Sequence, residues 1–136
     1  MFGTRRQARI VALQTLYEFD TVRHPPGDIL QRHLEEAQLP PEVEQFASHL
    51  VAGVLRNLEQ IDNAIQKAAP AWPLDQMAKM DKNVLRIAIF EILFDNRATP
   101  VKAVINEAVE LAKLFGSDAS SKFVNGVLGT VVLKNA

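Results

Sequence analysis

Apolar residues recur at steps of three and four along nearly the whole chain, and this periodicity constrains the fold more than any other feature. It is clearest in one stripe near the end of the chain, which consists of Val101, Val104, Ile105, Ala108, Leu111, Ala112 and Phe115. Such steps gather apolar side chains on one face of an α-helix, whereas a half-buried strand needs strict alternation, which is missing here. The sequence therefore predicts an all-α fold.

Prolines divide the first half of the chain into segments. A first helix is predicted over about 4–20, with Thr4 as its N-cap, and a second begins near Asp28. Pro41 suits the first position of a long third helix, whose apolar stripe continues to residue 65. The Pro-Ala-Trp-Pro stretch at 70–73 then predicts a linker between two subdomains, about 1–69 and 74–136.

The second half of the chain is more apolar. Residues 81–95 leave little polar surface, so we expect this helix to be buried on most sides at the centre of a bundle. Thr99-Pro100 predicts the start of the next helix, with the threonine as cap, and Gly116 predicts its end. Ser117 or Asp118 is expected to cap the last helix.

Composition excludes several classes of protein. Fifteen basic and 16 acidic residues give a formal charge of −1, so bulk positive charge cannot coat nucleic acid and any basic surface must be local. Cysteine is absent, which removes disulfides and thiolate metal sites. No apolar run approaches the ~20 residues of a membrane span, and the N-terminus lacks the pattern of a secretory signal. We expect a soluble, cytoplasmic protein.

The first predicted helix contains a conflict. Arg5, Arg6 and Arg9 fall on much the same side as the apolar stripe that follows them, and no acidic residue precedes Glu18. Unpaired guanidinium groups cannot be buried, because desolvating a charge is too costly. Two outcomes avoid this cost. In the first, the helix end stands in solvent, and the arginines are either a phosphate-binding cluster or simply a solvated basic end. In the second, carboxylates from elsewhere in the chain pair with them.

A second basic position occurs near the start of the last helix. Lys122 follows Ser120 and Ser121, and a helix N-terminus offers backbone donors and a positive dipole end to phosphate. Most surface lysines are only solvated, so this signal is weak by itself. Gly126 lies within the same helix, where glycine costs about 1 kcal/mol relative to alanine. That position indicates a tight helix crossing or a binding partner.

Isolated charged residues give a further signal. Arg86 and Glu91 interrupt the apolar segment 81–95, so they are either buried with partners or exposed at a protein interface. Tyr17, at the far end of the first helix, is amphipathic and also suits an interface. Glu107 and Glu110 are helix neighbours and are typical of a solvated face.

Residues for catalysis or metal binding are not apparent. The three histidines are scattered without ligand spacing, and neither a Gly-rich phosphate loop nor a nucleophile motif occurs. We therefore expect neither an enzyme nor a cofactor or metal site. Trp72, between two prolines, either anchors the linker onto the core or stacks on an RNA base.

Five motifs follow one another along the chain: RRQAR at 5–9, ALQTLY at 12–17, DKNVLRIAIFE at 81–91, TPVKAVINEAVELAK at 99–113 and KFVNGVL at 122–128. In this order and spacing, the sequence resembles the NusB family of bacterial transcription antitermination factors. The middle of the chain, roughly 20–70, matches only as a helical pattern. The resemblance implies a compact bundle of about seven helices in two packed subdomains.

The resemblance also implies a function and partners. It implies binding to boxA RNA of ribosomal RNA leader transcripts, a complex with the ribosomal protein NusE, and recruitment to RNA polymerase with other Nus factors. Carried over by motif, the expected RNA-binding residues are Arg5, Arg6, Arg9, Asp118 and Lys122, and the expected protein-partner residues are Tyr17 and Glu91. Gln7 and Gly129 depart from the family pattern; Gln7 stands where many relatives have a further basic residue, which suggests weaker RNA binding.

Two alternatives remain open. The chain is also similar to the N-terminal domains of ribosomal RNA methyltransferases, so it is alternatively a detached RNA-recognition domain. The second alternative is a structural helical dimerisation module, in which the arginines are only solvated. The sequence leaves the oligomeric state open, a homodimer included.

Overall fold

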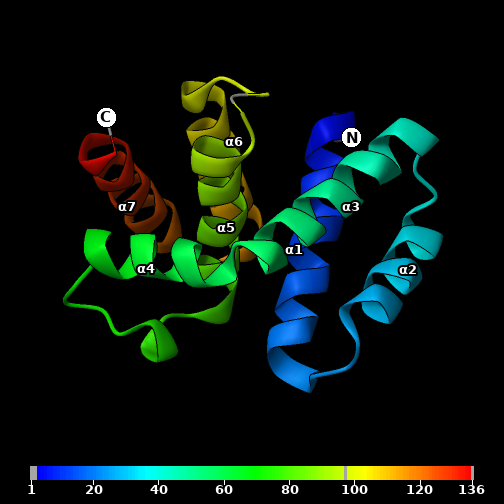
Figure 1. Cartoon of the computed structure of the whole chain (residues 1–136), viewed down its shortest axis with the longest axis horizontal. Coiled ribbons are helices and arrows are strands. Elements are labelled where there is room, and N and C mark those ends of the chain that lie inside the picture. Colours follow the sequence, from blue (N-terminus) through cyan, green and yellow to red (C-terminus); the bar gives the residue numbers. More distant parts are fainter. Residues whose placement is uncertain (1–2, 97, 136) are drawn as a thin grey trace.

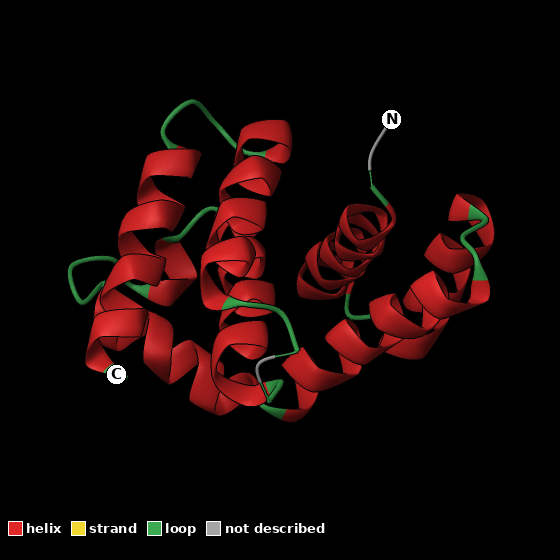
Figure 2. Ribbon diagram, turned by 90° about the horizontal axis from the view of Figure 1, so that it is seen from above, coloured by secondary structure: helices red, strands yellow, loops and turns green. Residues whose placement is uncertain are grey.

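The computed structural model describes residues 3–96 and 98–135 as helices joined by short loops, with no strand in that part of the chain (Figures 1 and 2). The predicted all-α fold is confirmed. The elements are α1 (Thr4–Val22), α2 (Pro26–Ala37), α3 (Pro41–Arg56), α4 (Leu58–Ala68), the 3₁₀ turn η1 (Leu74–Gln76), α5 (Lys79–Ile89), the π-helical turn η2 (Phe90–Phe94), α6 (Val101–Phe115) and α7 (Ser120–Lys134). Among the described helices, none is long and apolar enough to cross a membrane.

The predicted side-chain caps are wrong. Gly3 precedes α1 in place of a Thr4 cap, and Pro100 precedes α6. Thr99 does not cap α6; its hydroxyl accepts a hydrogen bond from Arg5. Before α7 the Ser120 hydroxyl accepts from the backbone N–H of residue 117 within the preceding turn, and the residue at the cap position is an alanine. Thr99 and Ser120 therefore serve tertiary and loop contacts that a local pattern does not reveal.

The long third helix predicted from Pro41 is also wrong, because the chain breaks at Asn57 into α3 and α4. The Asn57 side chain donates to the carbonyl of Gly53 at 2.8 Å. Beyond this break α4 packs against α5 and α7, while α1, α2 and α3 pack together on the other side of the molecule (Figure 1). The packing partners thus change at residue 57, and the subdomain division at 70–73 stays a prediction.

The predicted central helix is confirmed as α5 followed by η2. Every residue from Lys82 to Glu91 is buried, and α5 contacts α1, α4, α6 and α7. At the crossing with α3, a Cβ on Gly53 would lie only 2.2 Å from the ring of Phe90. Glycine is therefore required at position 53 for close approach of η2.

The Pro-rich segment is attached to the C-terminal helices. Trp72 meets Phe123 edge to face with ring centroids 6.1 Å apart, yet 55% of its side chain remains exposed. Gln66 donates to the Trp72 carbonyl at 2.7 Å and accepts from the backbone of Leu74. These contacts agree with an anchoring role for Trp72. Gly126, by contrast, is exposed with nothing within 4 Å of its Cβ position, so the predicted tight helix crossing there is wrong.

Candidate nucleic-acid interface

The arginine cluster (Arg5, Arg6 and Arg9) lies at the beginning of α1, beside α3, η2 and α6. Arg9 is the innermost member. Its Nε and Nη2 donate to both carboxylate oxygens of Glu91 at 2.9 and 2.8 Å. The two side chains are only 4% and 1% exposed, so this is a buried ion pair between α1 and η2.

Arg6 forms a second pair nearer the surface. Its Nε and Nη2 donate to Glu107 of α6 at 3.0 and 2.8 Å, and the side chains are 28% and 24% exposed. This hydrogen bond raises the pKa of Arg6, and it lowers the pKa of Glu107 against the opposing effect of burial. Glu107 Oε1 also lies 3.9 Å from Nη1 of Arg9, so one carboxylate faces two guanidinium groups.

Arg5 is the exposed member of the cluster. Its guanidinium carbon lies 3.9 Å from the centroid of the Phe46 ring, and Nη2 donates to the Thr99 hydroxyl at 3.3 Å. The same ring lies 5.3 Å from the guanidinium carbon of Arg9. Within residues 3–96 and 98–135, no carboxylate lies at ion-pair distance from Arg5. A cation stacked on an aromatic face keeps its outward N–H donors available for an anion.

The geometry decides between the two outcomes that the sequence left open. The expectation that the whole cluster stands in solvent is wrong, because carboxylates distant in sequence pair with Arg6 and Arg9. Three cations face two carboxylates, so the site keeps one net positive charge. Arg5 is the one member of the cluster that no carboxylate of the described residues pairs with, although it contacts Thr99 and Phe46.

Asp118 and Lys122 lie away from the arginine cluster. Both are exposed, in the turn before α7 and in its first turn. Arg5 contacts Thr99, two residues before the start of α6, whereas Asp118 follows the end of α6, whose 15 residues span about 22 Å. No contact in the described part of the chain joins these two positions to the arginine cluster, so the structure presents two separate basic positions.

Comparisons with known proteins identify the family. The NusB family model matches residues 6–133. The chain belongs to the NusB family. It is 55% identical over 133 residues to transcription antitermination protein NusB of Roseiflexus castenholzii, covering 97% of this chain and 94% of that protein. The corresponding protein of Chloroflexus aggregans is 52% identical over 131 residues, with 96% and 87% covered.

Solved structures show the same NusB fold. A T. maritima NusB structure superposes with a TM-score of 0.90 at 32% identity, covering 98% of this chain and 94% of that one. A crystal structure of antitermination factors NusB and NusE in complex with dsRNA gives a TM-score of 0.89 at 28% identity, covering 98% and 99%.

The two residues expected at a protein interface of this NusB-family chain differ in accessibility. Tyr17 is 39% exposed on α1. Glu91 is buried and paired with Arg9, which is the first of the two alternatives that the sequence left open for this residue. Its role at a protein interface stays a prediction. Arg86 is buried as well, and its Nε and Nη2 donate to Asp62 of α4 at 2.9 Å.

A partly buried polar network holds the end of α1 that carries Tyr17. Asp20 accepts from Lys82 of α5 at 2.9 Å and lies 3.6 Å from Arg86. Burial by itself raises the pKa of Asp20, but Lys82 and Arg86 outweigh it and lower this pKa. The last turns of α1 are therefore attached to the central helix.

Two residues of the candidate interface were missed by sequence reasoning. Phe46 is part of an ordinary apolar stripe, and only the fold places its ring under Arg5. Glu107 was expected on a solvated face with Glu110. Glu110 does behave this way, being 43% exposed and 3.7 Å from Lys113, whereas Glu107 pairs with Arg6.

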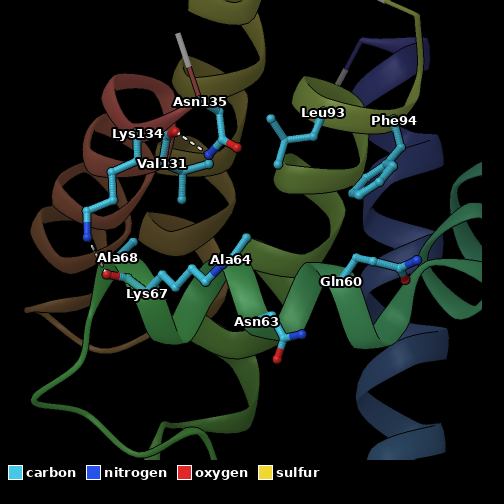
Figure 3. Close-up of a pocket in the computed structure, with 10 residues that line it drawn as sticks. All are labelled: Gln60, Asn63, Ala64, Lys67, Ala68, Leu93, Phe94, Val131, Lys134 and Asn135. Carbon is cyan, nitrogen blue, oxygen red and sulfur yellow. Dashed lines mark hydrogen bonds between the residues drawn. The ribbon is translucent and has the colours of Figure 1, made fainter.

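A pocket of about 350 Å³ lies away from the arginine cluster, between α4, η2 and α7 (Figure 3). Leu93 and Phe94 of η2 line this pocket together with Gln60 and Asn63 of α4, and Lys134 donates to the carbonyl of Lys67 at 2.8 Å. In the described part of the chain, no group of three or more His, Cys, Asp or Glu side chains is arranged to hold a metal ion.

Proposed function

We propose that this protein acts in transcription antitermination as an RNA-binding adaptor without a catalytic role. Its RNA is the boxA-type single strand of ribosomal RNA leader transcripts, and its protein partner is the ribosomal protein NusE. With other Nus factors, this complex assembles on RNA polymerase. Membership of the NusB family supports the proposal, as does the similarity to a NusB structure that contains NusE and dsRNA.

The observation that carries the proposal is the exposed guanidinium group of Arg5. It is held on the Phe46 ring and by Thr99, and no described carboxylate neutralises it. Guanidinium binds phosphate through two parallel hydrogen bonds, and a side chain already held in place loses less conformational freedom on binding. Arg5 is therefore the first point of attachment for the RNA backbone, with Arg6 beside it.

The second contact is the start of α7. Lys122 is exposed in the first turn, where the free backbone N–H groups and the helix dipole favour an anion. Asp118 lies just before this turn and accepts hydrogen bonds from donors on a base or ribose. A flexible single strand that follows α6 reaches both positions, with its bases free for edge contacts and stacking.

The protein partner binds at the end of α1 that carries Tyr17. This aromatic side chain is partly exposed on a helix end that Asp20 and Lys82 hold in place. Aromatic residues on a rigid element are typical anchors of protein interfaces. Glu91 contributes indirectly, by holding Arg9 and thereby the position of α1.

A titration with labelled boxA-type RNA tests the proposal, with and without NusE. If Arg5, Arg6 and Lys122 each contact one phosphate, the logarithm of the affinity falls with the logarithm of salt concentration with a slope of about −2. NusE is expected to raise the affinity, and a duplex of the same sequence is expected to bind less tightly than the single strand.

Arg5→Ala is the decisive variant, with Arg56→Ala as its control. Arg56 is likewise exposed, in the last turn of α3, so both variants remove one positive charge. Arg5→Ala is expected to reduce the affinity about fivefold at 0.1 M salt and to make the slope shallower by about 0.7. Equal effects of the two variants, or no RNA binding by the unchanged protein with NusE, would contradict the proposal.

A further inference from the structure

The two ion pairs of the arginine cluster differ in their ability to open. Arg9 and Glu91 are buried almost completely, and separating them would leave a charge without a partner in the core. Arg6 and Glu107 are each about one-quarter exposed, so water reaches both groups. Only the second pair can open without burying an unpaired charge.

The surroundings of Glu107 make an exchange of partners feasible. If its carboxylate leaves Arg6, Nη1 of Arg9 lies 3.9 Å from Oε1 to begin with, and the Glu107 side chain is already 24% exposed to solvent. The Nε–Nη2 edge of Arg6, which Glu107 occupies, is one of the two edges through which guanidinium binds phosphate bidentately. An RNA strand held by the adjacent Arg5 presents its next phosphate to Arg6 at a high effective concentration.

We propose that an RNA phosphate displaces Glu107 from Arg6, so that Glu107 is an affinity-determining residue that competes with RNA for this arginine. The inference rests on the proposed RNA-binding function. It gives the three arginines different roles: Arg5 attaches the strand, Arg6 exchanges partners and Arg9 holds the helix.

Glu107→Gln is the direct test, with Glu110→Gln as its matched control. Glu110 lies about one turn further along α6, where its carboxylate is 3.7 Å from the ammonium group of Lys113 and acts on Arg6 only by a longer-range Coulomb interaction. The control therefore changes the net charge equally while leaving Arg6 hydrogen-bonded to Glu107. We expect Glu107→Gln to raise the affinity for boxA-type RNA about two- to fivefold, which corresponds to the strength of a partly exposed ion pair. Glu110→Gln is expected to produce a smaller gain.

Two measurements separate the exchange of Glu107 for phosphate from a general effect of charge: the salt dependence of RNA affinity, and the effect of Glu107→Gln in a protein that also carries Arg6→Ala. In an exchange, the number of bound phosphates is unchanged, so Glu107→Gln keeps the slope of the unchanged protein. The gain also disappears when Arg6 is alanine. A slope steeper by about 0.7 would mean that Arg6 binds phosphate only in the variant, and it would overturn the exchange.

Arginine side-chain NMR on the unchanged protein gives a second measurement that requires no variant to fold. The Nε–H signal of Arg6 is expected to shift on RNA addition, because its acceptor changes from Glu107 to phosphate. The corresponding signal of Arg9 is expected to stay in place, since Glu91 remains its partner.

Three results overturn the exchange while leaving RNA binding intact: a lower affinity of Glu107→Gln, a gain no larger than that of Glu110→Gln, or an unmoved Arg6 signal at saturating RNA. Absence of RNA binding by the unchanged protein with NusE overturns the proposed function, and the exchange with it. The two failures are therefore distinguishable in the same titration.

Discussion

Replacing Glu91 with alanine is expected to lower the free energy of unfolding by about 3–5 kcal/mol, because the change leaves a buried charge unpaired. The two hydrogen bonds of 2.8 and 2.9 Å to Arg9 would be lost, and the guanidinium group is only 4% exposed, so water cannot replace them without opening the core. For a chain of 136 residues, this corresponds to a fall in melting temperature of roughly 10–20 °C. Urea unfolding followed by circular dichroism at 222 nm measures the loss.

A double replacement tests the physical reason. Arg9→Met combined with Glu91→Leu removes both charges and fills the space with apolar atoms, which is often neutral or stabilising by about 1–4 kcal/mol. The double variant is therefore expected to be more stable than Glu91→Ala, and to keep RNA affinity within about twofold if Arg9 serves only to hold α1. The reasoning would be refuted if the double variant were as unstable as Glu91→Ala, or if Glu91→Ala lowered the free energy of unfolding by less than about 1 kcal/mol.

Two further predictions concern packing and pH. Gly53→Ala is expected to lower the free energy of unfolding in urea by about 1–3 kcal/mol, because the new Cβ meets the buried Phe90 ring. Gly129→Ala, which has open space at its Cβ position, is the control and is expected to be neutral or stabilising. Equal effects of the two variants would contradict this reasoning. The pKa of Glu107 is lowered from its ordinary 4.5 in the folded state, so its pairing with Arg6 contributes stability above about pH 4.5 that is lost as pH falls through the lowered value. Stability measured between pH 6 and 3.5 should therefore fall less in Glu107→Gln than in the unchanged protein, and an identical fall would show that this pair contributes nothing.

Local pattern was sufficient for the all-helical class and for the family, but not for every helix boundary. The apolar steps of three and four predicted most of the helical segments, and the scarcity of polar residues at 81–95 predicted a buried centre, which the structure shows for residues 82–91. Both patterns can be recognised from residues close together in the chain. The missed break at Asn57 has a different origin. The apolar stripe continues across it, and the turn exists because α4 packs on α5 and α7, which lie later in the sequence.

The sequence by itself determined an all-helical NusB-family chain with three arginines at the start of its first helix. The tertiary structure alone decided which of them remains available. Arg6 and Arg9 pair with carboxylates 101 and 82 residues away, on α6 and η2, while Arg5, among the residues that the structure describes, contacts an aromatic ring and a hydroxyl but no carboxylate. Whether a charge is neutralised depends on distances of a few ångströms in space, and separation along the chain carries no information about them.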